Sequence, residues 1–186
     1  MERLYRLLEP LVKWQNILIG VIFIILINAV FFPQSDRKRK SVAPEAQPIL
    51  DLQYAYSPEE AYSALDSFGE NGRNQYLKSV FLIDTAYPLI YGITYSLLLI
   101  FLLKIVFPNR KNLHRWGILP IAVSILDVLE NTGIVLLLAT YPVRHDGIAL
   151  ATSVFTTLKW TLAILLIIFL IVLSLVWILR RKQIRT

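Results

Sequence analysis

The sequence predicts an all-α integral membrane protein, an up-and-down bundle of four transmembrane helices with one short extramembrane helix in the first loop. Two observations support this class. Hydrophobic residues make up 56% of the 186 residues and charged residues only 17%, far from the balance of an ordinary soluble domain. The hydrophobic residues also form four long runs, each close to or above the roughly 20 residues that cross the hydrocarbon layer. The chain from residue 1 to residue 186 is therefore expected to be a single membrane domain.

The four runs predict helices at about residues 14–32, 80–104, 116–140 and 148–179. The first run is expected to be a retained helix, because a mixed-charge segment precedes it and no small residues follow at the spacing of a signal-peptide cleavage site. The connections between the last three helices are short, which makes these helices antiparallel neighbours. Residues 148–158 are expected to extend the last helix beyond the lipid.

The long first connection, residues 33–79, has two parts. Its charged, proline-containing opening predicts a mobile strap. Further on, Ser57 as a cap, Pro58 at the first helical position and Glu60 in a capping box predict a helix at about residues 58–67.

The sequence GENGR, which begins at Gly69, predicts a turn after this short helix. Glu70 and Arg73 in this turn are candidates for contact with a phosphate headgroup or another anion. A solvated ion pair is the simpler interpretation.

Basic residues next to the helices predict the orientation of the chain. The segment before the first helix, the second connection and the tail together hold 11 Lys and Arg, and the first and third connections hold seven. Both termini are therefore expected to be cytoplasmic, in a plasma membrane or a bacterial inner membrane. The cluster from Arg37 to Lys40 directly follows the first helix and favours the inverted orientation. Because the basic residues have this role, the net charge of +6 calls for no nucleic-acid partner.

The residue types exclude several kinds of chemistry. The chain has no cysteine and two histidines, both in short connections, so neither a thiolate nor a histidine metal site is expected. No P-loop, HExxH or GxSxG motif is present. We therefore expect no metal and no cofactor.

Polar residues inside the apolar runs predict a pocket. A rise of about 1.5 Å per residue places Asp127 and Glu130 near the middle of the membrane, and Asp84 and Lys159 near its outer boundary. About 100° of rotation per residue puts the polar residues of each of three helices on one face. Such faces point away from lipid, so they should converge on a polar interior that opens outward. The candidate pocket residues are Asp84, Tyr87, Tyr91, Tyr95, Asp127, Glu130, Asn131 and Lys159.

Each candidate has a simpler interpretation. The tyrosines fit core packing, and Lys159 with Trp160 fits an anchor at the membrane interface. Asp127 and Glu130 are neighbours at a spacing of i, i+3, so one of them should be protonated unless a cation sits between them. Such a pair can exchange protons, bind a cation or hold helices together.

The leading functional hypothesis is a pocket that binds or conducts a cationic or amphiphilic, lipid-like ligand, or protons. A lipid-acting acid–base enzyme inside the membrane and a structural or accessory subunit are the two alternatives. The expected partners are the lipid bilayer and a small ligand, and a homo-oligomer is left open.

Overall fold

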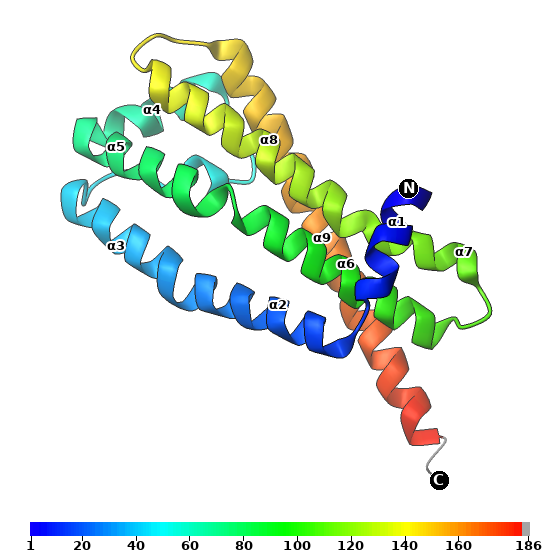
Figure 1. The fold of residues 1–186 in the computed structure, drawn as a ribbon. Helices are drawn as coiled ribbons and strands as arrows, with labels where there is room; N and C mark the ends of the chain where they lie inside the picture. The colour runs from blue at the N-terminus through cyan, green and yellow to red at the C-terminus, as the bar shows by residue number, and fades with distance from the viewer. Residues whose placement is uncertain (184–186) are drawn as a thin grey trace. The chain divides into compact units, whose positions relative to one another are not determined.

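The computed structural model describes residues 1–183, and every regular element in this range is helical (Figure 1). Four helical stretches are long and apolar enough to cross a membrane: Trp14–Val42, Gly69–Val106, Lys111–Thr140 and Asp146–Arg180. The predicted all-helical class and the four long apolar helices are therefore confirmed.

The first long stretch extends further than its apolar run. It consists of α2 (Trp14–Leu26), a π-helical segment (Ile27–Phe31) and α3 (Phe32–Val42). The strap expected after residue 33 is thus helical as far as Val42. Charge pairing on α3 accounts for this, because Asp36 accepts a hydrogen bond from Arg39 and pairs with Lys40 at 2.7 Å, and such i, i+3 and i, i+4 pairs stabilise a helix.

Two short elements precede α2. They are α1 (Glu2–Leu8) and a 3₁₀ turn (Glu9–Leu11). The side chains of Tyr5 and Leu8 are buried, so α1 packs against the molecule by one face.

The short helix α4 (Pro58–Ser67) has the expected bounds and the expected capping box. Oγ of Ser57 accepts a hydrogen bond from the backbone N–H of Glu60 at 3.2 Å, and Oε2 of Glu60 accepts one from the N–H of Ser57 at 2.7 Å. Gly69 follows with a φ of +59°, a conformation that glycine adopts without strain, and it ends α4.

The turn expected at GENGR is helical. The helix α5 (Gly69–Ser79) starts directly after α4 and continues through a π-helical segment (Val80–Asp84) toward α6 (Tyr87–Val106). The single positive φ at Gly69 is enough to redirect the chain, so no longer turn is needed. The second long stretch therefore begins well before the residue 80 that hydrophobicity indicated.

The rest of the chain consists of α7 (Lys111–His114), a 3₁₀ turn (Arg115–Ile118), α8 (Leu119–Thr140) and α9 (Asp146–Gln183). The helix α9 includes the residues that were expected to extend the last helix. One further 3₁₀ turn, Leu50–Leu52, lies in the segment before α4.

The chain divides into two compact units. Unit 1 contains Met1–Phe23, Leu89–Ser124 and Thr161–Thr186, and unit 2 contains Ile24–Pro88 and Ile125–Trp160. The core of unit 2 joins α4, α5, α8 and α9 through residues such as Leu65, Phe68, Tyr76, Ile134 and Ala149. Unit 1 has two apolar clusters, one centred on Ile17 and Ile100 and one on Leu103 and Leu170.

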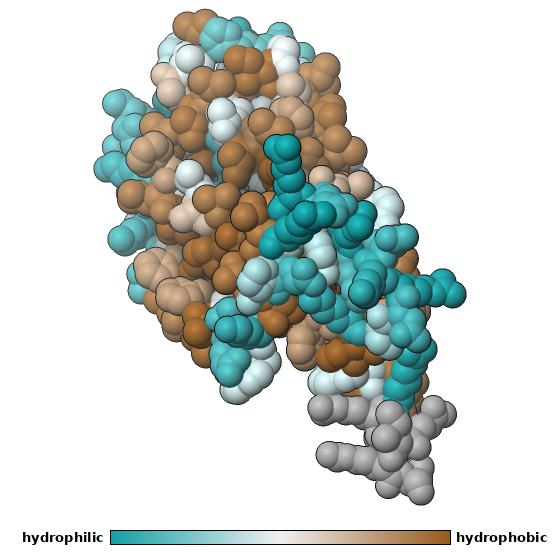
Figure 2. Space-filling view, turned by 45° about the vertical axis from the view of Figure 1, so that its right-hand side comes forward, coloured by the Kyte–Doolittle hydropathy of each residue, from teal (hydrophilic) through white to brown (hydrophobic). Residues whose placement is uncertain are grey.

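Many large hydrophobic side chains are exposed. They are numerous on α2 and on the second half of α9, for example Phe23 and Ile171. Figure 2 shows hydrophobic residues over much of the visible face. An exposed apolar surface of this extent is typical of a protein that contacts lipid.

Candidate functional site

A buried ion pair network links α8 to α9 within unit 2. The ammonium of Lys159 contacts Oε2 of Glu130 and lies 3.5 Å from Oδ1 of Asp127. Lys159 is 8% exposed and Glu130 is fully buried. One cation therefore serves two carboxylates, and we call Asp127, Glu130 and Lys159 the charged triad.

Helical spacing and a close approach of the two helices explain this geometry. Asp127 and Glu130 are one turn apart on α8, and Thr152, Thr156 and Lys159 follow one another on a face of α9. The helices come close at Gly133, where an added Cβ would lie 2.0 Å from Oγ1 of Thr152. This contact leaves the polar faces near enough for direct ion pairing.

Glu130 is bound through both carboxylate oxygens. Oε1 accepts a 2.8 Å hydrogen bond from the hydroxyl of Thr156, and Oε2 contacts the ammonium of Lys159. The Thr156 hydroxyl also lies 2.9 Å from the carbonyl of Thr152, and since it has one proton, it donates to one acceptor at a time. Glu130 is thus held in place by α9.

Asn131 connects the triad to the segment that precedes α6. Its Nδ2 donates to the carbonyl of Asp84 at 2.7 Å and to Oδ1 of Asp127 at 3.3 Å. Pro88 has no N–H to donate to the carbonyl four residues before it, which is that of Asp84. The amide of Asn131 therefore supplies the Asp84 carbonyl with a donor that Pro88 cannot provide.

The structure brings Asp127, Glu130, Asn131 and Lys159 together, with the backbone of Asp84. Among the described residues, the carboxylate of Asp84 makes no ion pair, and Lys159 pairs with the carboxylates of α8 instead. Because its ammonium is bound inside unit 2, the interpretation of Lys159 as an exposed interfacial anchor does not describe it.

The candidate tyrosines are divided between the two units. The hydroxyl of Tyr87 accepts a 2.8 Å hydrogen bond from Asn28, and its ring meets that of Phe32 edge to face at 5.1 Å. Tyr87 therefore contacts the first long helix. Tyr91 and Tyr95 belong to unit 1, where their ring centroids lie 6.2 Å apart.

The two headgroup candidates lie in α5. Arg73 donates a 3.1 Å hydrogen bond to the carbonyl of Leu65, near the end of α4, and its guanidinium lies 3.8 Å from the ring centroid of Tyr141. A hydrogen bond to Asp66 raises the pKa of the Tyr141 hydroxyl. Arg73 thus satisfies a terminal helix carbonyl, and Glu70 is exposed in the first turn of α5.

The segment at residues 50–57 packs along α9 between Ser153 and Trp160. The sequence did not predict this contact. Trp160 donates to the carbonyl of Asp51 at 3.1 Å, Thr157 to that of Tyr54 at 3.0 Å, and the N–H of Tyr56 to Oγ of Ser153 at 2.9 Å. The signal was the apolar and aromatic run ILDLQYAY inside an otherwise polar connection.

Tyr56 carries a polar group that the fold leaves without a partner. Its hydroxyl is buried and has no hydrogen-bond partner among the described residues. Burial raises the pKa of this hydroxyl well above its usual value, and the charge of Glu130 adds to the effect. Buried hydroxyl groups without a hydrogen-bond partner are uncommon in folded proteins.

Other kinds of site find less support. In the part of the chain that the structure describes, no three His, Cys, Asp or Glu side chains are grouped to hold a metal ion. No protein-family model matches this chain, and neither a curated protein nor a solved structure matches it. Its function must therefore be inferred from the geometry of the molecule itself.

Proposed function

We propose that this chain is a multi-pass membrane protein that binds and releases a proton at the charged triad. In this proposal the four long helices cross the bilayer in alternating directions, both termini are cytoplasmic, and the triad lies in the interior of the bilayer. The observation that carries the proposal is the single ammonium of Lys159 placed between two carboxylates.

The charge count of the triad leads to proton binding. With both carboxylates ionised and Lys159 charged, the triad carries one net negative charge. A charge removed from water costs several kcal/mol unless it is compensated. A proton on one carboxylate removes the excess and requires no additional space.

Asp127 is the group that would take up this proton. Glu130 is fully buried and both its oxygens are engaged, whereas the side chain of Asp127 is 13% exposed. The 3.5 Å between Asp127 and the ammonium is also long for a charge-assisted hydrogen bond. A proton therefore has easier access to Asp127 than to Glu130.

Infrared difference spectroscopy of the full chain in lipid nanodiscs tests this proposal. Between about pH 5 and about pH 9, above the range of an ordinary aspartate, we expect the carbonyl band of a protonated carboxyl group to change with pH. Asp127→Asn should remove this band. Asp146→Asn is the matched control, because that carboxylate lies on α9 but is exposed, and the band should persist.

If no carboxyl group titrates in this range in the wild-type protein, the triad is a permanently charged network and the proposal fails. A structural subunit is then the better candidate. The specific support for it is that Thr156 and Lys159 both hold Glu130, while Asn131 holds the backbone of Asp84. For such a subunit, substitutions in the triad should lower stability, and neither the wild type nor the variants should show a carboxyl band that changes with pH.

A further inference from the structure

Unit 1 contains a charged cleft that the proposed function does not use. It has a volume of about 510 Å³ and lies among α1, the end of α6, and α7. Ligand sites typically have volumes of about 300–1,000 Å³. Figure 2 shows hydrophilic side chains gathered over α1 and α7. The charged groups that line the cleft are Glu2, Arg6, Glu9, Lys104, Lys111 and Arg115.

The two carboxylates are already paired. Glu2 contacts Arg6 and Arg115, each at 2.7 Å. Glu9 pairs with Lys104 at 2.9 Å and accepts a 2.9 Å hydrogen bond from the hydroxyl of Tyr5. Hydrogen bonds from Arg6 and Lys104 lower the pKa values of Glu2 and Glu9 respectively, so both are ionised at neutral pH.

Positive charge therefore exceeds negative charge in the cleft by two, with four cations against two carboxylates. Arg6 and Arg115 share one carboxylate, and Lys111 has no ion-pair partner among the residues whose side chains are described. The surplus is concentrated in a concave surface, where it attracts anions more strongly than isolated surface charges do.

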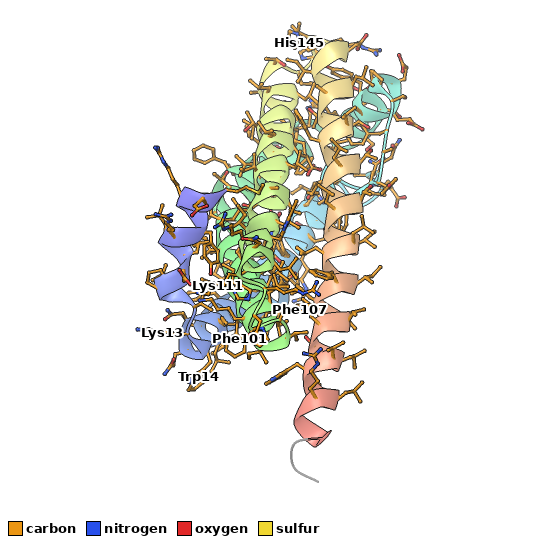
Figure 3. All side chains as sticks on the ribbon, turned by 90° about the vertical axis from the view of Figure 1, so that its right-hand side faces the viewer. Lys13, Trp14, Phe101, Phe107, Lys111 and His145 are labelled. Atoms are coloured by element: carbon orange, nitrogen blue, oxygen red, sulfur yellow. The ribbon has the colours of Figure 1, made fainter. Side chains whose placement is uncertain are left out.

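The turn that carries Lys111 is fixed by a buried histidine. His114 is 5% exposed, and its Nε2 lies 3.0 Å from the carbonyl of Phe107, to which it donates. Figure 3 labels Phe107 and Lys111 at this turn between α6 and α7. The ammonium is thus presented from a fixed backbone, which lowers the entropic cost of binding an anion.

We propose that this cleft binds a phosphate monoester group, whose two negative charges match the surplus. The guanidinium groups of Arg6 and Arg115 can each present paired N–H donors to phosphate oxygens. Trp14 and Trp116, also in unit 1, are 61% and 50% exposed, and exposed tryptophans concentrate at membrane interfaces. A lipid headgroup is therefore the favoured source of the phosphate, and a soluble phosphate is the other.

Native mass spectrometry of the full chain in detergent micelles tests this proposal. With equal amounts of phosphatidic acid and phosphatidylcholine, we expect the phosphatidic acid adduct to be retained preferentially. Lys111→Gln should weaken its binding about tenfold, the equivalent of one charge-assisted hydrogen bond. Arg110→Gln is the matched control, because Arg110 is adjacent and also exposed but does not line the cleft. It should leave binding unchanged.

Inorganic phosphate distinguishes the two sources. If millimolar phosphate displaces phosphatidic acid from the wild-type protein, the cleft recognises soluble phosphate; if it does not, the cleft recognises the lipid. Two results would overturn the proposal. One is equal retention of both lipids together with no response to phosphate, and the other is an equal loss of binding in the Lys111 and Arg110 variants.

Discussion

The hydroxyl of Thr156 donates a 2.8 Å hydrogen bond to Oε1 of Glu130, whose other oxygen contacts the ammonium of Lys159. The neighbouring helix thus satisfies both oxygens of a fully buried carboxylate. Asp127 lies farther from the same ammonium, at 3.5 Å, and is partly exposed. The triad therefore consists of a tight pair, Glu130 and Lys159, and a third group that lies farther from the shared ammonium.

Removal of the shared cation should strongly destabilise the protein. Lys159→Met leaves two carboxylates without their ion partner, and we expect the free energy of unfolding in detergent to fall by about 3–5 kcal/mol. The double variant Lys159→Met with Glu130→Gln should recover a large part of this loss, because it also removes the buried negative charge. Circular dichroism during denaturant unfolding gives both values. Equal stability of the single and double variants would contradict the pairing.

The two carboxylates should respond differently to neutralisation. Glu130→Gln places an amide against a buried ammonium and should cost about 2–4 kcal/mol of unfolding free energy. Asp127→Asn should cost less than about 1 kcal/mol, since its ion pair is longer and the site keeps one carboxylate for Lys159. The same unfolding measurement compares them. If Asp127→Asn were the more damaging change, the distinction between the tight Glu130–Lys159 pair and the more distant Asp127 would not describe the energetics of the triad.

Much of this site follows from the sequence, because helical phase is a strong constraint. About 100° of rotation per residue put Asp127, Glu130 and Asn131 on one face of the third predicted helix, and it put Lys159 on the polar face of the fourth. Both faces meet in unit 2. Helical phase does not show which residue of one helix will pair with which residue of its neighbour. Asp84 and Lys159 were both expected near the outer boundary of the membrane, whereas in the structure Lys159 pairs with the carboxylates of α8.

Other structural features could not be predicted from the hydrophobic runs. The helix through Arg39 and Lys40 is stabilised by their pairing with Asp36, and charged pairs of this kind lie outside the apolar runs. Asn28 donates to Tyr87. It is a single amide within an apolar run, so the hydrophobicity pattern gives no sign of this hydrogen bond. Residues 50–57 contact α9 across about a hundred positions of the sequence. These residues follow no helical or strand periodicity, so the contacts could not be predicted from a pattern.

A side chain at Gly133 should disturb the contact between α8 and α9. The Cβ of Gly133→Ala would lie 2.0 Å from Oγ1 of the buried Thr152. We expect a loss of about 1–3 kcal/mol of unfolding free energy, since packed helices must separate or Thr152 must shift. Adding Thr152→Ala should restore part of it. Gly147→Ala is the matched control, because nothing lies within 4 Å of its added Cβ. Similar losses in both glycine variants would indicate a general effect of glycine replacement.

Acid should release α1 from the rest of unit 1. The hydrogen bond from Lys104 lowers the pKa of Glu9, and that from Arg6 lowers the pKa of Glu2, each from an ordinary value of 4.5. A carboxylate with a lowered pKa in the folded state stabilises that state above its unfolded pKa and loses this contribution as the pH falls through the folded value. The ion pairs of Glu2 with Arg115 and of Glu9 with Lys104 attach this end of the chain to the rest of unit 1. Their contribution to stability should therefore be constant near neutral pH and decrease below pH 4.5.

Hydrogen exchange, expressed as protection factors to remove the intrinsic effect of pH, measures this attachment. The amides of residues 5–8, which are hydrogen-bonded within α1, should keep constant protection between about pH 7 and about pH 5 and lose it at lower pH. Glu9→Gln should lower protection already at neutral pH and reduce its dependence on acid, because one of the two titrating contacts is gone. Glu45→Gln, which replaces an exposed carboxylate in unit 2, should behave as the wild type. Protection of α1 that is the same at pH 3 as at pH 7 would show that its buried side chains, Tyr5 and Leu8, hold it without the ion pairs.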